Sequence, residues 1–490
     1  MVKSYAGIIT APKIPNDVVW LNTQQSIDIH ELKGKTIILA FWNWECIEGY
    51  AAFIALAKLQ KEFPNTLVIH VHSPHFEAHK DLSFIQEHIV RYEISEPVIV
   101  DNKFHLCQAY GIQGWPSVAI IDPLGKIAGT FWGEDMYENL KPVLAGLSYE
   151  FSLFGIINFK PLSFSTILLS RDKERLSFPT KIIFAPERNS FFISDTSNHR
   201  IIECSREGKV LQVIGNGKKG NKDGTFEEAT FFAPQGLAWD SARNMLYVAD
   251  TLNHLIRKVD FSTGNVSTIA GSLYHRYIPI KKGKANEMAL HTPLDIFLQG
   301  DNLYIAMGGL HQIWVLNLNS NDMYLHCGSG FQQLIDGHSL KAALALPNSI
   351  FIYNNILFFT EGENSSLRYL ENDQVKTFIG KGLFEYGDRE GPVETAALQY
   401  PQALAIHENK VFIADSYNHK IKVLDLEQRI VYTLVGTGKK GNKNASGLTS
   451  EIAAPAGLVY CDNALYFTDT HNSCVKRYDF TQDRVDTFLE

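Results

Sequence analysis

The last two-thirds of the chain repeats one pattern of short apolar strands separated by polar turns. In each repeat a proline begins an apolar strand, a second strand ends in a polar turn, and two more strands complete the unit. The repeat recurs every 54 to 59 residues, and its prolines are Pro179, Pro234, Pro293, Pro347, Pro401 and Pro455. Four short strands per repeat predict one propeller blade each, so six repeats predict a six-bladed β-propeller over residues 177–490.

The second strand of most repeats ends in an acidic residue that is followed by Asn and often His. Repetition in blade after blade favours a structural role, because a metal site needs only one converging set of ligands. We therefore expect no metal, and predict that the aspartates accept backbone N–H bonds in the turn between the second and third strands. The asparagines are predicted to adopt the left-handed conformation. The residues concerned are Asp195, Asp250, Asp415, Asp469, Asn198, Asn253 and Asn418.

The first part of the chain alternates strands with helices. Such an order, ending in a hairpin and a helix, predicts an α/β sandwich. The predicted strands are 36–42, 67–71, 97–100, 117–121 and 127–131, and the predicted helices are 50–63, 81–91, 103–110 and 134–147. We place this domain at 1–150 and a connecting segment at 151–176. That segment is rich in Phe, Leu and Ile, so it is predicted to pack between the domains.

Two family resemblances follow from these motifs. The strand that ends in Phe41-Trp42 and is followed by Cys46, with the later segment Trp115-Pro116-Ser117, resembles a thioredoxin-like domain of the redoxin type. The Asp-x-x-Asn-His repeats resemble those of the NHL family. Together they resemble the thioredoxin-domain NHL-repeat proteins. The implied fold class is multidomain: an α/β thioredoxin-like fold followed by an all-β six-bladed propeller.

The thioredoxin-like resemblance implies a redox site. It places the nucleophilic cysteine at Cys46 and a cis-proline at Pro116, with a binding groove beside Trp44 and Trp115. The second cysteine of a thioredoxin pair is replaced by Gly49. Disulfide reduction needs a second thiol to resolve the mixed disulfide, so this site is predicted to be degenerate.

The reactivity of the Cys46 thiol is left open by opposing effects. The start of the following helix favours the thiolate, whereas the flanking Glu45 and Glu48 disfavour it. Cys107 is the only other cysteine of the domain, and its predicted helix argues against direct reach to Cys46.

Two inter-blade loops share the pattern Gly-x-Gly-Lys-Lys-Gly-Asn-Lys. We expect them on the same propeller face as the Asn-His turns, where lysines and histidines could together receive an acidic partner peptide; solvated loop lysines are the alternative. The residues are Lys218, Lys219, Lys439, Lys440, His199, His254 and His419.

Composition narrows the partners and the compartment. The 45 basic and 53 acidic residues give a net charge of -8, which argues against nucleic acid as a partner. No apolar run reaches the ~20 residues that span a bilayer, and the six scattered cysteines form no C-x-x-C pair. We therefore expect a cytoplasmic protein that binds no membrane and no cofactor.

Two functions remain. The favoured one is a scaffold that binds a protein or peptide through its propeller face. The alternative is a one-cysteine thiol-disulfide oxidoreductase or thiol peroxidase, in which glutathione or another external thiol resolves Cys46.

Overall fold

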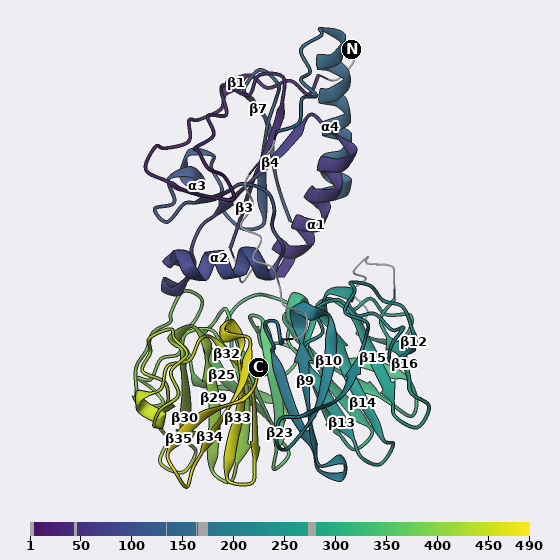
Figure 1. The fold of residues 1–490 in the computed structure, drawn as a ribbon, viewed down its shortest axis with the longest axis vertical. Helices are drawn as coiled ribbons and strands as arrows, with labels where there is room; N and C mark the ends of the chain where they lie inside the picture. The colour runs from purple at the N-terminus through teal and green to yellow at the C-terminus, as the bar shows by residue number, and fades with distance from the viewer. Residues whose placement is uncertain (1–3, 44–46, 134, 163, 165–174, 273–280) are drawn as a thin grey trace. The chain divides into compact units, whose positions relative to one another are not determined.

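The computed structural model describes residues 4–43, 47–133, 135–162, 164, 175–272 and 281–490. The chain divides into two compact units, Met1–Ser170 and Arg171–Glu490. The first is an α/β domain with the thioredoxin-like fold and the second is an all-β propeller (Figure 1). Both fold classes agree with the sequence prediction.

The first unit is built on one seven-stranded mixed sheet. Its strand order is β1-β7-β6-β3-β4-β5-β2, in which β3 and β4 run parallel and β6 is antiparallel to β3. The strands are β1 (Ile9–Thr10), β2 (Val19–Leu21), β3 (Thr36–Trp42), β4 (Thr66–His72), β5 (Val98–Val100), β6 (Ser117–Ile121) and β7 (Lys126–Trp132).

Helices cover both faces of this sheet. Alternate residues of β3 point to opposite faces: Ile38 packs with α1 (Ile47–Glu62) and α4 (Met136–Leu153), whereas Leu39 packs with α3 (His105–Ala109). The remaining helix is α2 (Leu82–Arg91), preceded by the short 3-10 helix η1 (Glu77–Lys80). The first helix begins three residues before its predicted start, and the last one continues six residues beyond its predicted end.

The described part of the connecting segment is tied to the first unit. Beyond α4, Ile156 packs against the core formed by α1 and α4, and Phe164 packs against the core on the other face. The Asn158 N–H donates to the Gly34 carbonyl at 2.9 Å. Leu176 belongs to a core cluster of the propeller. The residues between them, 165–174, lie outside the described part of the chain.

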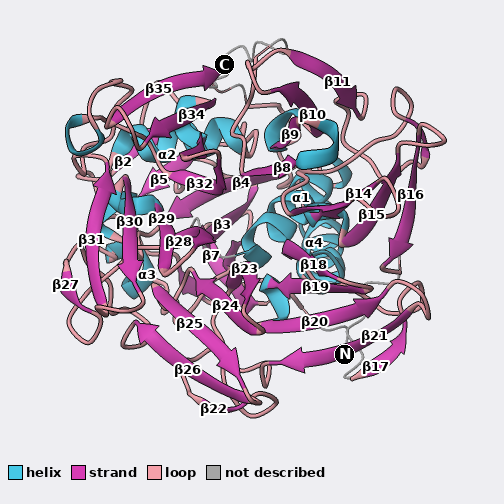
Figure 2. Ribbon diagram, turned by 90° about the horizontal axis from the view of Figure 1, so that it is seen from below, coloured by secondary structure: helices cyan, strands magenta, loops and turns pink. Residues whose placement is uncertain are grey.

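The propeller consists of six antiparallel sheets, each made from one continuous stretch of chain (Figure 2). The blades are β8 (Lys181–Ala185), β9 (Ser190–Asp195), β10 (Arg200–Ser205), β11 (Val210–Ile214); β13 (Leu237–Asp240), β14 (Met245–Asp250), β15 (Leu255–Asp260), β16 (Asn265–Ala270); β18 (Pro293–Gln299), β19 (Asn302–Met307), β20 (Gln312–Asn317), β21 (Asp322–Cys327); β23 (Pro347–Tyr353), β24 (Ile356–Glu361), β25 (Ser366–Glu371), β26 (Gln374–Ile379); β28 (Pro401–His407), β29 (Lys410–Asp415), β30 (Lys420–Asp425), β31 (Ile430–Val435); and β32 (Pro455–Cys461), β33 (Ala464–Asp469), β34 (Cys474–Asp479), β35 (Arg484–Leu489).

Four blades carry a fifth strand that the repeat pattern does not predict. It is two or three residues long, comes from the loop that enters the blade, and pairs with the outermost strand. These strands are β12 (Gly224–Thr225), β17 (Lys282–Lys284), β22 (Gly337–His338) and β27 (Gly391–Pro392).

In four blades the aspartate at the end of the second strand joins two parts of its blade. In the second blade the Asp250 carboxylate accepts the backbone N–H of Phe232 at 2.7 Å and the Asn253 side chain at 2.8 Å. The backbone donor thus lies ahead of the first strand, not in the turn between the second and third strands as the sequence analysis expects. The left-handed residue also differs from the prediction: it is His254, with φ 56°, rather than Asn253.

A hydrogen bond across each junction connects every blade to the next. The left-handed residue of one blade accepts the backbone N–H of the residue that precedes the proline of the following blade. The acceptor–donor pairs are His199–Ala233 (3.2 Å), His254–Thr292 (2.9 Å), His311–Leu346 (3.1 Å), Ser365–Tyr400 (3.2 Å), His419–Ala454 (3.1 Å) and Ser473–Phe178 (3.3 Å).

The last of these pairs closes the ring between the sixth and first blades. Side chains from both blades also share one core cluster, including Phe191 and Tyr466, whose rings are 4.5 Å apart. Closure therefore rests on side-chain contacts and hydrogen bonds, and the first and sixth blades keep separate four-stranded sheets.

Candidate functional site

The predicted redox segment directly follows β3. Trp44 and Cys46 lie outside the described residues, whereas the stretches of chain on either side of them are described. Trp42, the last residue of β3, is 1% exposed, and its ring contacts Phe53 of α1 at 4.8 Å. The end of β3, immediately before the predicted redox segment, is therefore anchored in the core.

Pro116 lies beside the same end of the sheet. The Trp115–Pro116 peptide is cis, as the family resemblance implies, and Ser117 pairs with Phe41 across β6 and β3. Trp115 is half-buried and packs against Phe104, with ring centroids 6.4 Å apart. Its indole N–H is buried and has no hydrogen-bond partner among the described residues.

Buried histidines lie behind this end of the sheet, and the sequence analysis did not single them out. His70 and His72 point from β4 toward Trp42, with ring centroids 6.0 and 5.2 Å away. Burial lowers the pKa of His72 to about 3 and that of His75 to about 4, and it also lowers the pKa of His70. These rings are therefore neutral at physiological pH. The His-x-His-x-x-His spacing at 70–75 was the available signal.

Cys107 is poorly suited to resolve a disulfide at Cys46. Its thiol is buried in the core and contacts the Ser73 hydroxyl at 3.0 Å. Burial raises its pKa to about 11, so the thiol is almost entirely protonated at neutral pH.

In the described residues, no group of three or more His, Cys, Asp or Glu side chains is arranged to hold a metal ion. None of the described helices is long and apolar enough to cross a membrane.

The two lysine loops of the propeller have the same local structure. Lys219 forms a parallel bridge with Phe231, and Lys440 forms the equivalent bridge with Ile452. A glycine carbonyl in each loop accepts the side chain of the asparagine in the neighbouring turn at 2.7 Å, in the pairs Gly220–Asn253 and Gly441–Asn472. The loops thus lie beside the Asn-containing turns.

The lysine side chains point to solvent to different degrees. Lys218, Lys219 and Lys439 are exposed, whereas Lys440 is partly buried. The Lys219 ammonium also lies 5.5 Å from the centre of the Phe232 ring. The first loop connects β11 of the first blade to β13 of the second, and the other connects β31 of the fifth blade to β32 of the sixth, so the two loops lie at separate blade junctions.

The three predicted histidines serve the blade junctions instead of an open surface. His199 and His419 are 7% and 9% exposed, and His254 is partly buried. Each uses Nδ1 to accept a backbone N–H of the next blade. Their role in ring assembly restricts what they can offer a partner.

The sequence analysis also missed a buried cation seven residues after the acid in four blades. Arg257, Arg368, Lys422 and Lys476 are fully buried, and each pairs with the acidic residue of its blade at 2.8 to 3.1 Å. The constant spacing of seven was the signal. These pairs belong to the framework of the propeller.

Comparison with known proteins supports both halves of the chain. The model of the AhpC/TSA family matches residues 11–130. The protein SUPPRESSOR OF QUENCHING 1, chloroplastic, from Arabidopsis thaliana is 32% identical over 96% of this chain, which spans 47% of that protein. NHL repeat-containing protein 2 from Bos taurus is 32% identical over 98% of this chain, which spans 71% of that protein. The thiol-disulfide oxidoreductase ResA from Halalkalibacterium halodurans is 26% identical over 24% of this chain and 69% of its own length.

Proposed function

This chain belongs to the family of NHL repeat-containing protein 2, and we propose that it is a two-domain recognition protein. Its propeller binds an acidic peptide segment of a partner protein, and its thioredoxin-like domain provides a second binding surface with a degenerate single-cysteine site. The observation that carries this proposal is that two lysine loops, one between the first and second blades and one between the fifth and sixth, have the same backbone bridge.

The loops favour recognition because their backbones are fixed while their charges stay available. The Gly220 and Gly441 carbonyls each accept a hydrogen bond of 2.7 Å from an asparagine side chain, which fixes the backbone of each loop. Among the described residues, Lys218 and Lys439 have no ion-pair partner. A positive surface on a pre-organised backbone attracts an acidic chain without the entropic cost of ordering the loops.

The test uses a fluorescein-labelled peptide of ten glutamates and the full chain. Reversal of Lys218, Lys219, Lys439 and Lys440 to Glu should abolish the change in fluorescence anisotropy. A matched variant that reverses the exposed Lys209, Lys341, Lys376 and Lys410 should bind the peptide nearly as well as the wild type. Equal losses in both variants would mean that net charge alone attracts the peptide, and would overturn the assignment of the site.

The degenerate site is supported by Gly49 at the resolving position and by the buried Cys107. The alternative, a one-cysteine oxidoreductase resolved by glutathione or another thiol, is favoured by the similarity to ResA. The rate of Cys46 alkylation against pH separates the two, with Cys46→Ser as the control. A midpoint near pH ~8.5, that of a free thiol, supports the degenerate site, whereas a depressed midpoint supports the oxidoreductase.

We also propose that the protein works in a reducing compartment, most simply the cytoplasm. The five described cysteines are free and buried, which fits a chain that does not depend on disulfides. Alkylation after denaturation of protein isolated without reductant should label all six cysteines; a disulfide would contradict this placement.

A further inference from the structure

A cavity of about 340 Å³ lies in the first unit next to Lys35, the residue that precedes β3. It is thus at the start of β3, whereas the predicted redox segment follows the end of that strand. Its wall includes Lys35, Thr66, Leu67, Glu96, Leu162 and Phe164. Cavities of roughly 300–1,000 Å³ that combine apolar walls with a few polar groups are typical of small-molecule sites.

Lys35 is a buried cation without a buried anion beside it. The residue is 4% exposed, and its ammonium donates to the Lys160 carbonyl at 2.6 Å. An ammonium has three donors, and among the described residues Lys35 has neither a second acceptor nor an ion-pair partner. Burying a charge without a counter-ion is energetically costly. An anion bound in the cavity would pair with the Lys35 ammonium and reduce this cost.

Thr66 adds a second unmet polar group to the same wall. Its hydroxyl oxygen is buried and has no hydrogen-bond partner among the described residues. Buried hydroxyl groups in native proteins are normally paired. Thr66 lines the cavity beside Lys35, so an acceptor that enters the cavity can be bound by the Lys35 ammonium and lies close to the Thr66 side chain.

The other walls limit which anion fits. Leu67, Leu162 and Phe164 supply apolar surface. The Glu96 carboxylate already accepts the backbone N–H and hydroxyl of Ser95 at 3.1 and 3.2 Å. Its negative charge repels any anion in the cavity, and repels a dianion about twice as strongly as a monoanion.

We propose that this cavity binds a small organic monoanion, a carboxylate attached to a short apolar group. The carboxylate lies against Lys35 and Thr66, and the apolar group packs against Leu67, Leu162 and Phe164. Such a ligand supplies the acceptor that the ammonium lacks and removes apolar surface from water. This site is independent of the propeller surface and of Cys46.

Isothermal titration calorimetry with the full chain tests the proposal, using hexanoate as the probe. Hexanoate should bind, while hexan-1-ol and hexylammonium, which have the same apolar chain, should bind at least about tenfold more weakly because they lack the anion. Lys35→Met should weaken hexanoate binding by a similar factor. Lys33→Met is the matched control, since Lys33 is exposed, and it should bind hexanoate as the wild type does.

Thr66→Val keeps the shape of the side chain and provides a second variant if Lys35→Met fails to fold. It should weaken hexanoate binding several-fold without changing the far-ultraviolet circular dichroism spectrum. The proposal is overturned if hexanoate produces no binding heat, if hexan-1-ol binds equally well, or if hexanoate binds equally to the wild type and both cavity variants.

Discussion

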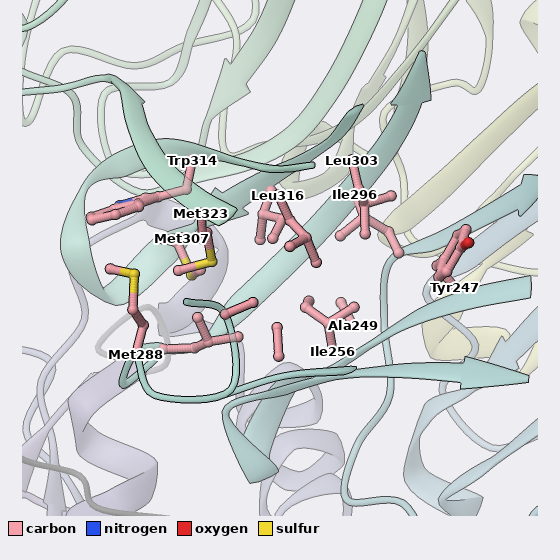
Figure 3. Packing of buried hydrophobic residues seen from close by; sticks show 14 of the residues in the cluster. Tyr247, Ala249, Ile256, Met288, Ile296, Leu303, Met307, Trp314, Leu316 and Met323 are labelled. Carbon is pink, nitrogen blue, oxygen red and sulfur yellow. The ribbon is translucent and has the colours of Figure 1, made fainter. Parts of the chain in front are cut away.

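The third and fourth blades fill the same position in opposite ways. In the fourth blade, Glu361 and Arg368 form a fully buried ion pair at 3.0 Å. In the third blade the corresponding residues are Met307 and Trp314, which are 0% and 3% exposed. Figure 3 shows these two side chains with Met288 and Met323 in a hydrophobic cluster that contains no charged side chain among the described residues.

This difference indicates that the residue at the end of the second strand and the residue seven places later change together. An acid occurs with a cation seven residues later in the second, fourth, fifth and sixth blades, and the third blade replaces both residues. The first blade keeps Asp195 but pairs it with Arg200 at 2.7 Å. A buried ion pair and a packed apolar pair can be similarly stable, whereas half of an ion pair is not.

The largest effect is expected from breaking one ion pair. Arg368→Met leaves the Glu361 carboxylate buried without its cation, and it also removes the bonds from Arg368 to the Ala343 and Ile335 carbonyls. The propeller should lose about 3–5 kcal/mol of unfolding free energy, measured by denaturant unfolding. The double variant Glu361→Met, Arg368→Trp, which copies the third blade, should lose less than the single variant. A single-variant loss below ~1 kcal/mol would contradict the comparison.

An acid introduced into the third blade without its cation should lower the unfolding free energy by about 3 kcal/mol. Met307→Asp places a carboxylate in a cluster whose described members include no cation. Hydrogen exchange measured by mass spectrometry should show faster exchange in β19 and β20. Addition of Trp314→Arg should restore part of the protection; if it restores none, the two blades are not interchangeable at this position.

Acid should destabilise the first unit, because this unit buries His72 and His75 as neutral rings whose pKa values lie well below the ordinary value. The pKa of His72 is about 3 in the folded protein, below its value of roughly 6.5 in the unfolded chain. Neutral His72 therefore contributes fully to the unfolding free energy above pH ~6.5, and this contribution is lost as the pH falls toward 3. At pH 5 the unfolding free energy should be lower by about 2 kcal/mol. Denaturant midpoints of the first unit between pH 7 and 5 measure this loss.

His72→Phe should flatten that pH dependence, whereas His105→Gln, at an exposed position, should leave it unchanged. An identical slope in His72→Phe and the wild type would show that other groups cause the acid sensitivity.

The smallest effect is expected at the junction that closes the ring. Ser473→Ala removes the acceptor of the Phe178 N–H. The propeller should lose about 1 kcal/mol of unfolding free energy, which is measured as a lower melting temperature. Ser241→Ala, at an exposed turn position, is the matched control. Equal melting temperatures for both variants would mean that side-chain packing alone closes the ring.

The sequence predicts the architecture well because the information is local and repeated. The prolines that recur every 54 to 59 residues locate the blades, and the apolar run before Cys46 locates β3 with its observed bounds. The cis peptide at Pro116 follows from the family resemblance. Each of these features depends on neighbours in sequence or on one recurring spacing.

The features that escaped prediction join distant parts of the chain. His254 accepts the N–H of Thr292, 38 residues later, and nothing in either local pattern indicates their contact. The cavity beside Lys35 is formed by segments near residues 35, 66, 96 and 162. Only the packed structure reveals that this lysine is buried without an anion.

The six junctions have a consequence for where the chain can be opened. Every blade is one continuous stretch of chain and contacts the next blade through an equivalent hydrogen bond. The junction between the sixth and first blades, where Ser473 accepts the Phe178 N–H, differs from the other five only because no chain segment connects the two blades. A circularly permuted propeller that starts at Pro347 and joins the old ends by a short linker should therefore assemble the same six blades.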